Sequence, residues 1–261
     1  MPSVRGIIKY SIKNHDCMTL YLIGIGIGDF KDITIKGLDA IRNSDEVFLE
    51  CYTSRINSSI EEMEKFYGKK VFPADRFFVE NKEDVLIKKA KTRNVALLII
   101  GDVFAATTHI NLFLSARKAN VEIKIIHNAS VLTAVGETGL DLYKFGRTVS
   151  IPFENKEIKS PADFIRENIK NGLHTLILLD MIPLENKFLR ISDAVDYLLM
   201  NKFSEKTLAV GCAALGTDDR EIKSGTLSEL SKKRFSKLPQ CLIILGKMHF
   251  VEEEMFGIWK D

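Results

Sequence analysis

Six consecutive apolar residues, Val95-Ala96-Leu97-Leu98-Ile99-Ile100, constrain the fold of this 261-residue chain more than any other segment. A strand with one solvated face alternates apolar and polar residues, whereas an unbroken run rich in Ile, Val and Leu indicates a strand buried on both faces. Such burial requires helices on both sides of a mostly parallel sheet. The run therefore predicts an α/β fold.

The residues that follow this run, Gly101-Asp102-Val103-Phe104-Ala105-Ala106-Thr107-Thr108-His109, bear on function. In an open α/β sheet, small ligands bind at the carboxyl ends of the strands. An acidic residue beside a glycine, followed by small side chains, lets a ligand approach the backbone closely. The same residues also fit a plain strand-to-helix turn in which Asp102 or Thr107 caps the next helix. The segment alone leaves a ligand-binding loop and a capped turn equally open.

A glycine-spaced loop near the start of the chain, Gly24-Ile25-Gly26-Ile27-Gly28-Asp29, also follows an apolar run. Glu50 lies twenty-two residues past Gly28, where a dinucleotide-binding protein holds a ribose hydroxyl. The spacing is Gly-x-Gly-x-Gly-Asp, however, and not the Gly-x-Gly-x-x-Gly of dinucleotide-binding loops. Asp29 would also repel a pyrophosphate at the mouth of the following helix. The loop therefore gives only weak support to NAD binding.

Strand and helix patterns alternate in the first half of the chain and much less in the second. The alternation predicts a mostly parallel, helix-covered sheet for the N-terminal half. In the second half the strands are joined by fewer helices, and one of them looks like an added hairpin strand, which predicts a mixed sheet. These strands are expected at residues 148–153, 175–179, 207–214, 221–226 and 241–245. We therefore expect two domains, residues 18–147 and 148–261, after a disordered extension or an upstream start over residues 1–17.

Composition excludes several classes of function. A net charge of +2, from 37 Lys and Arg against 35 Asp and Glu, gives no field strong enough to indicate nucleic-acid binding. No apolar run approaches the roughly 18 residues of a membrane span. The four cysteines and five histidines show no metal-ligand spacing, so no metal is expected. The four cysteines include no Cys-x-x-Cys pair, and three of them lie in or beside apolar, strand-like segments, as small buried hydrophobic residues do. This pattern indicates a reducing, intracellular setting, which we assign to the cytoplasm.

Individual charged residues give weaker signals. His109 either orients a substrate or serves only to cap or pack its helix. His127 and His174 flank expected buried strands, and we expect both to be hydrogen-bonded structural residues. The acidic run Glu252-Glu253-Glu254 predicts a solvated helix face.

Eight short segments in one order give the chain, from Met18 onward, a resemblance to a known family. They are Leu22–Asp29, Asp32–Leu38, Glu50–Ser54, Gly101–His109, Gly136–Leu140, Tyr143–Gly146, Gly172–Leu176 and Gly246–His249. These segments resemble those of the diphthine synthases, which are class III, tetrapyrrole-methylase-like methyltransferases that use S-adenosylmethionine. Val103 stands where the family usually has proline, and Asn128-Ala129-Ser130-Val131 replaces its usual Ala-Pro-Ser-Ile. Both differences concern the rigidity of loops.

The resemblance implies two α/β domains with the methyl donor bound in the cleft between them, and a homodimer. It places contacts to S-adenosylmethionine, and to its product S-adenosylhomocysteine, at Ile27, Asp102, Ala105, Ser130, Val131, Leu179, Leu215 and Gln240. Gln240 stands where the family usually has histidine, so its contact is expected through the backbone. Plain core packing remains the alternative for the aliphatic members of this set.

The reaction that the resemblance implies is methyl transfer to the amino nitrogen of a 3-amino-3-carboxypropyl group, carried by one modified histidine of translation elongation factor 2. Repeated N-methylation gives the trimethylammonium product diphthine, and some members of the family add a methyl ester. Alignment alone can supply about 7–11 kcal/mol of barrier reduction, so a protein base is optional and no catalytic residue is assigned. Three alternatives stay open: a tetrapyrrole methyltransferase of the same superfamily, an NAD-dependent oxidoreductase, and a non-catalytic nucleotide-binding partner of translation.

Overall fold

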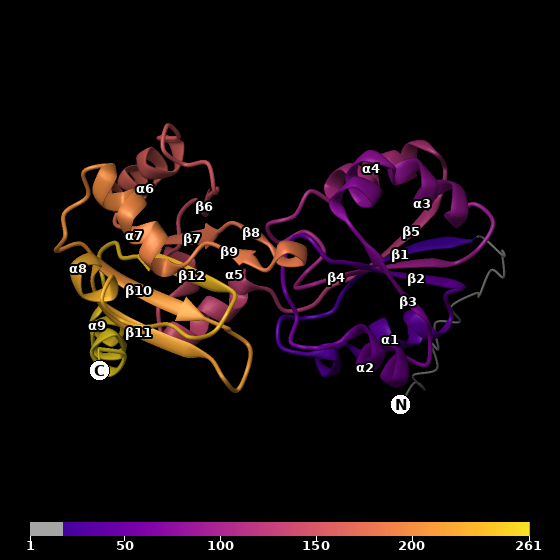
Figure 1. The fold of residues 1–261 in the computed structure, drawn as a ribbon, viewed down its shortest axis with the longest axis horizontal. Coiled ribbons are helices and arrows are strands. Elements are labelled where there is room, and N and C mark those ends of the chain that lie inside the picture. Colours follow the sequence, from indigo (N-terminus) through magenta and orange to yellow (C-terminus); the bar gives the residue numbers. More distant parts are fainter. Residues whose placement is uncertain (1–17, 261) are drawn as a thin grey trace, which may run out of the picture.

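The structure is a computed structural model that describes residues 18–260, so the expected extension over residues 1–17 lies outside the described residues. Two lobes, each built on a five-stranded sheet, lie side by side along the long axis of the molecule (Figure 1). The chain completes the sheet of the first lobe before it enters the sheet of the second.

Five parallel strands form the sheet of the first lobe: β1 (Thr19–Gly24), β2 (Glu46–Glu50), β3 (Val71–Ala74), β4 (Val95–Ile99) and β5 (Glu122–Ile126). Their spatial order is β3-β2-β4-β1-β5, and every residue of β4 is buried. Helices α1 (Ile35–Arg42) and α2 (Ile60–Tyr67) cover one face of the sheet. Helices α3 (Glu83–Ala90) and α4 (Ile110–Lys118) cover the other (Figure 1). The parallel sheet that the apolar run predicted is confirmed.

Two helices in this lobe show where the local sequence is enough to predict the ends of a helix and where it is not. α2 begins with a capping box at Ser59 and ends at Gly68, whose φ of +72° suits glycine. α4 begins at Ile110, later than a helix capped by Asp102 or Thr107 would begin. Ala106, four residues before this start, has a φ of +59°, which lies outside the right-handed helical range.

The second lobe contains the mixed sheet that the sequence predicted. Its strands are β6 (Val149–Ile151), β7 (Thr175–Leu179), β10 (Leu208–Ala213), β11 (Glu221–Thr226) and β12 (Gln240–Ile244). They lie in the order β11-β10-β12-β7-β6; β6 and β7 are parallel, and the other neighbours are antiparallel. Helices α6 (Ser160–Lys170), α7 (Ile191–Met200) and α8 (Leu227–Leu230) pack on one face, and α5 (Val131–Ala134) and α9 (Phe250–Ile258) on the other.

The connection between the lobes belongs by its packing to the second sheet. Val131, Val135, Leu140 and Phe145 all join the apolar cluster on the α9 face of that sheet. A short hairpin of β8 (Met181–Ile182) and β9 (Lys187–Phe188) lies between the lobes (Figure 1). The domain boundary at residue 147 stays a prediction.

The first turn of α9 departs from the solvated face expected of its acidic run. The Glu252 side chain is 4% exposed, and its carboxylate accepts hydrogen bonds from Lys144, from His174 and from two backbone amides. Burial acts to raise the pKa of Glu252, but the hydrogen bond from Lys144 and those from the other donors outweigh it and lower that pKa to about 2. Glu253 and Glu254 are exposed. The prediction was therefore wrong for Glu252, whose side-chain partners lie 78 and 108 residues away along the chain.

Candidate functional site

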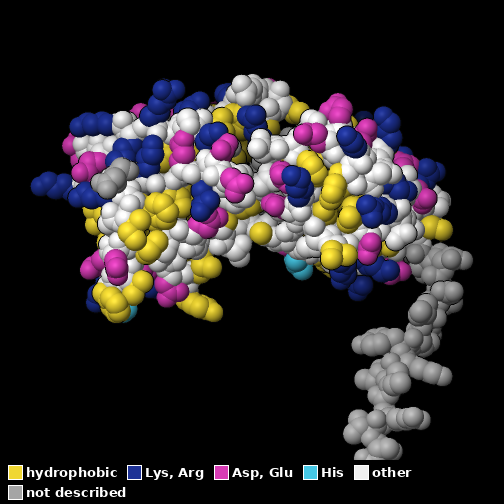
Figure 2. Space-filling model, turned by 90° about the horizontal axis from the view of Figure 1, so that it is seen from below, with side chains coloured by type: hydrophobic (Ala, Val, Ile, Leu, Met, Phe, Trp, Pro, Cys, Tyr) yellow, Lys and Arg dark blue, Asp and Glu magenta, His cyan; other side chains and the backbone are white. Residues whose placement is uncertain are grey.

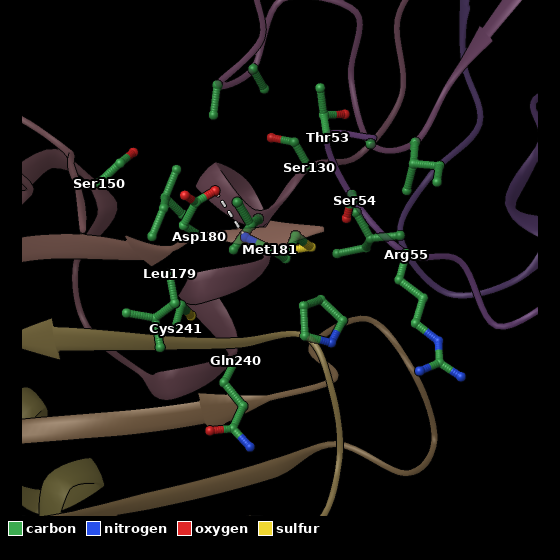
Figure 3. A pocket seen from close by; sticks show the side chains of 18 of the residues that line it. Thr53, Ser54, Arg55, Ser130, Ser150, Leu179, Asp180, Met181, Gln240 and Cys241 are labelled. Atoms are coloured by element: carbon green, nitrogen blue, oxygen red, sulfur yellow. Dashed lines mark hydrogen bonds between the residues drawn. The ribbon is translucent and has the colours of Figure 1, made fainter. Parts of the chain in front are cut away.

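A cavity of about 370 Å³ lies between the two lobes. The first lobe lines it with residues that follow each of the strands β1 to β5, so the cavity opens at the carboxyl ends of these parallel strands. The second lobe contributes residues of β6, β7 and β12 (Figure 3). In a space-filling view from below, the surface is hollowed between the lobes (Figure 2). The carboxyl edge of an open α/β sheet is where such proteins bind ligands.

Two glycine loops meet at this edge. The chain leaves β1 toward β2 on one side and leaves β4 toward β5 on the other, so the neighbouring ends of β1 and β4 form a topological switch point. Gly26 and Gly101 exchange backbone hydrogen bonds of 3.3 and 2.7 Å, and their φ angles are +81° and +88°. A Cβ on Gly24 would lie 2.7 Å from the Gly101 carbonyl oxygen. The glycine spacing in the sequence therefore allows the two loops to pair.

The first glycine loop is not arranged to bind a pyrophosphate. The Gly28 amide donates to Asp32 Oδ2 at 2.7 Å, and Asp29 Oδ1 accepts from the Lys31 amide at 2.7 Å. Glu50, the ribose-binding candidate for NAD, is fully buried and does not line the cavity. The structure therefore contradicts the NAD-dependent alternative.

Seven of the eight residues expected to contact the methyl donor line this one cavity, although they are scattered between positions 27 and 240. They are Ile27, Ala105, Ser130, Val131, Leu179, Leu215 and Gln240. Leu179 and Leu215 also belong to the two apolar clusters of the second lobe, so packing in the core and lining the cavity coincide there. Their contact with a donor stays a prediction.

Asp102, the eighth residue, lies directly after Gly101, which lines the cavity. Its Oδ1 accepts from the Phe104 amide at 3.1 Å, and its Oδ2 accepts from the Asn128 amide at 3.1 Å and from His127 Nδ1 at 2.8 Å. Burial acts to raise the pKa of Asp102, and these hydrogen bonds outweigh it and lower the pKa. The carboxylate is therefore ionised and held in one orientation.

Neither of the two expected caps stabilises the start of α4. The N-cap residue is His109, which makes no side-chain hydrogen bond to the helix. Asp102 lies eight residues before Ile110, and Thr107 Oγ1 donates instead to the Val103 carbonyl at 2.7 Å. The interpretation of the segment as a capped turn is therefore wrong.

Gln240 faces the core with its side chain. Its Oε1 accepts from the Ile191 amide at 3.0 Å, and its Nε2 donates to the Lys237 carbonyl at 2.9 Å. Figure 3 shows this side chain directed away from Leu179 and Asp180. Only the backbone of Gln240 remains for a ligand, in keeping with the contact expected for it.

The loop that departs from the family pattern is tied down by its own side chain. Asn128 Nδ2 donates to the carbonyls of Gly24 and Asp32, each at 3.0 Å, and Asn128 Oδ1 accepts from the Ala129 amide at 2.8 Å. Val103, the other departure, is fully buried. Hydrogen bonds and packing hold these loops where the family usually has proline.

Several polar residues of the cavity wall were not singled out from the sequence. They are Thr53, Ser54, Arg55, Arg76 and Asp180, of which all but Arg76 are labelled in Figure 3. Thr53 and Ser54 lie in a segment that carries the family resemblance, and Asp180 directly follows an expected strand. Position at a strand end was therefore the signal that could have found them.

A buried glutamate–histidine pair lies behind Thr53. Glu50 is fully buried, and His109 Nε2 lies 3.9 Å from Glu50 Oε2. His109 is 1% exposed and does not line the cavity, so it cannot touch a ligand there. By contrast, His174 is a hydrogen-bonded structural residue, as expected, and His127 is hydrogen-bonded to Asp102.

Two further features are absent from residues 18–260. No helix in this part of the chain is long and apolar enough to cross a membrane. No three side chains of His, Cys, Asp or Glu gather there as a metal site would require, and the expectation of no metal stays a prediction.

Comparisons with known proteins identify the family to which this two-lobed α/β fold, with its cavity between the lobes, belongs. Residues 19–231 match the model of the tetrapyrrole (corrin/porphyrin) methylases. The diphthine methyl ester synthases of Dictyostelium discoideum and Homo sapiens are 38% and 40% identical to the chain, over 93% and 92% of its length and 98% and 94% of theirs. A crystal structure of a diphthine synthase has a TM-score of 0.88 at 38% identity, and the match covers 93% of this chain and 96% of the other. The chain therefore belongs to the tetrapyrrole methylase family and, within it, to the diphthine synthases.

Proposed function

We propose that this protein transfers methyl groups from S-adenosylmethionine to the 3-amino-3-carboxypropyl group on one modified histidine of translation elongation factor 2, a step of diphthamide biosynthesis. The observation that carries the proposal is the convergence of seven expected donor contacts on one cavity between the lobes. The relatives named diphthine methyl ester synthases favour this acceptor over a tetrapyrrole.

The cavity wall fits the parts of the methyl donor. Ile27, Leu179 and Leu215 offer apolar surface for an adenine ring. A Cβ added to Gly101 would meet Ile27 and Ser130 only at 3.8 Å, so the glycine leaves a cradle that a ligand can fill. Asp102 Oδ1 accepts one hydrogen bond in the structure and has a second lone pair for a ribose hydroxyl or an ammonium group.

The chemistry depends mainly on alignment and on a dry site. The bound donor supplies an electrophilic methyl group on a sulfonium. The chain holds the donor between the lobes and excludes water with buried residues such as Leu179 and Leu215. Correct alignment of two reactants supplies about 7–11 kcal/mol of barrier reduction.

The hollow between the lobes also suits a large acceptor. A side chain on a folded protein must be delivered into the site, and the surface view shows the hollow open on one side (Figure 2). Positive and negative side chains are interspersed on this face, so shape and polar contacts matter more for docking than a single charge field (Figure 2). Three N-methylations give diphthine, and the names of the relatives support a fourth transfer to the carboxylate as a methyl ester.

We also propose that the protein works as a homodimer in the cytoplasm. Tyr143 and Phe250 are 96% and 69% exposed, and large exposed apolar side chains are typical of association surfaces. Cys51, Cys212 and Cys241 are free thiols, which fits a reducing compartment.

Mass spectrometry of the acceptor tests the proposal. Elongation factor 2 carrying the aminocarboxypropyl histidine is incubated with the enzyme and S-adenosylmethionine. We expect successive mass gains of one CH2 unit, all on that histidine. If free tetrapyrroles gain methyl groups and the factor gains none, the assignment fails in favour of a tetrapyrrole methyltransferase. Calorimetry should detect binding of S-adenosylmethionine and none of NAD.

A further inference from the structure

The proposed reaction raises the question of where protons go. The acceptor amine is an α-amino group, and amino groups have pKa values between about 8 and 10, so it is mostly protonated near neutral pH and has no lone pair for attack. Each of the three N-methylations therefore needs one deprotonation. Methylation of the carboxylate needs none, because a carboxylate already has its lone pairs. A proton acceptor in the wall of the cavity would serve the N-methylations alone.

Thr53 and Glu50 form such an acceptor. Thr53 lines the cavity (Figure 3). Its Oγ1 donates to Glu50 Oε2 at 2.6 Å. Glu50 Oε1 accepts from the backbone amides of Tyr52 and Thr53 at 3.0 and 2.6 Å, which fixes the carboxylate. Because Thr53 directs its own hydrogen toward Glu50, the lone pairs of its oxygen are available to a donor in the cavity.

His109 stands on the far side of the same carboxylate. Its Nδ1 lies 3.3 Å from the Val103 carbonyl oxygen, which can only accept, so Nδ1 carries the proton and Nε2 has the lone pair. Nε2 lies 3.9 Å from Glu50 Oε2 and has no hydrogen-bond partner within residues 18–260. Two buried acceptors thus face each other, and one additional proton would satisfy both. Buried polar atoms without a hydrogen-bond partner are rare in folded proteins, so the position of His109 Nε2 requires an explanation.

We propose that Glu50, through the hydroxyl of Thr53, takes up the proton that the acceptor amine loses before each N-methylation. The ammonium N–H passes its proton to Thr53 Oγ1 while Thr53 passes its own proton to Glu50 Oε2. The freed amine lone pair then forms the N–CH3 bond as the C–S bond breaks and leaves its electron pair on sulfur. Glu50 and His109 share the proton until the products leave, and it returns through Thr53 to water. Thr53 touches the substrate, and Glu50 and His109 act through it.

The titratable groups around Glu50 are compatible with uptake of this proton by its carboxylate. Burial lowers the pKa of His109, and the negative charges of Glu50 and Glu80 act against that effect, so His109 is neutral before the transfer. Tyr52, 7% exposed, has its pKa raised first by burial and then by Glu50, so it stays protonated. Cys51 has a raised pKa for the same two reasons and stays neutral. Arg76, a cation of the cavity wall, lies with its guanidinium 5.3 Å from the Tyr52 ring centroid and with its Nε 3.9 Å from Glu80 Oε1.

The test compares two acceptors in single turnovers, and it rests on the proposed function. One is elongation factor 2 with the unmethylated aminocarboxypropyl histidine, and the other is the factor with the trimethylated group. For Glu50→Gln we expect N-methylation at about pH 7 to fall by about 100-fold or more, the lower range for general base catalysis, while ester formation on the trimethylated factor keeps its rate. Raising the pH toward about 9 should restore N-methylation in the variant.

Variants of Thr53 separate the hydroxyl from the fold of the loop. Thr53→Ser keeps the hydroxyl and should keep the wild-type ratio of the two rates, whereas Thr53→Val should lower the N-methylation rate alone. Ser150→Ala removes another hydroxyl of the cavity wall and should leave the ratio unchanged. An equal loss of both rates in Glu50→Gln, or a loss without rescue at high pH, overturns the proton route and leaves the proposed function intact. A wild-type enzyme that methylates neither acceptor overturns both.

Discussion

Two buried glutamate–histidine pairs, one in each lobe, have opposite surroundings. In the second lobe, Glu252 accepts hydrogen bonds from Lys144 and from His174 Nε2 at 3.0 Å. His174 Nδ1 in turn accepts from a backbone amide at 3.1 Å. In the first lobe, no ion pair joins Glu50 to a lysine or arginine within residues 18–260, and His109 Nε2 lacks a hydrogen-bond partner there. Only the pair with incomplete hydrogen bonding is joined to a residue of the cavity wall, through the hydrogen bond from Thr53 to Glu50.

The difference separates structural from chemical use of the same residue types. A buried carboxylate with a cation and a full set of donors is fixed in one protonation state, and its loss weakens the fold. A buried carboxylate whose one side-chain donor is a hydroxyl of the cavity wall remains able to take up a proton. Burial of a glutamate and a histidine together is therefore not itself a sign of function. The number of hydrogen bonds made to the pair distinguishes a structural role from a chemical one.

The largest effect on folding is expected at the satisfied pair. Glu252→Gln removes the partner of Lys144 and should lower the free energy of unfolding by about 3–5 kcal/mol, the range for breaking a buried ion pair. Urea unfolding followed by circular dichroism measures the change. Glu253→Gln, on the exposed side of the same helix, is the matched control and should stay within about 0.5 kcal/mol of the wild type. Equal effects of the two substitutions would show that the pair contributes nothing.

The same pair should make stability depend on acid. The pKa of Glu252 falls from 4.5 to about 2 on folding, so its contribution is present above pH 4.5 and is lost as the pH falls to about 2. A shift of this size corresponds to about 3 kcal/mol. Burial also lowers the pKa of His174, so a further loss of stability begins as the pH falls below 6.5. Urea midpoints recorded through this range should fall more steeply for the wild type than for Glu252→Gln, and parallel curves would contradict the assignment.

A third carboxylate–histidine pair, Asp102–His127, lies near the cavity with its histidine exposed. If the free lone pair of Asp102 binds the methyl donor, Asp102→Ala should weaken the affinity for S-adenosylmethionine by about 1.5–3 kcal/mol, the range for hydrogen bonds to charged groups. Isothermal titration calorimetry measures it, with an unchanged circular dichroism spectrum as the check on folding. An unchanged affinity would restrict Asp102 to holding its own loop.

The smallest effect is expected from the partner of Asp102. The His127 side chain is 68% exposed, and exposed ion pairs contribute about 0.2–1 kcal/mol. His127→Ala should therefore change donor affinity by less than about 1 kcal/mol in the same titration, because the Phe104 and Asn128 amides still orient the carboxylate. A loss as large as that of Asp102→Ala would mean that His127 itself binds the donor.

The sequence predicted the first lobe well because its signals are local. The apolar run of β4 shows burial on both faces, and the glycines after β1 and β4 mark the loops that pair at the switch point. The convergence of residues from 27 to 240 on one cavity follows from the fold that the family resemblance implied.

What the sequence left out depends on contacts between distant segments. Glu252 looks like any surface glutamate until His174 and Lys144 are placed beside it. Glu50 was considered only as a ribose ligand, because nothing local shows that His109 closes its far side. Ala106, in the loop before α4, has a left-handed backbone, an unusual conformation for alanine that the local sequence does not indicate.

The most direct test of the contrast between the two pairs is the pH–rate profile of the first N-methylation, measured in single turnovers. Wild type, Glu50→Gln and Glu252→Gln are compared between about pH 6 and 9, at a temperature where all three are folded. We predict that the Glu252→Gln profile keeps the wild-type shape, while the Glu50→Gln rate rises about tenfold per pH unit as the amine loses its proton to water. Three profiles of one shape would contradict the account, because Glu50 would then be as purely structural as Glu252.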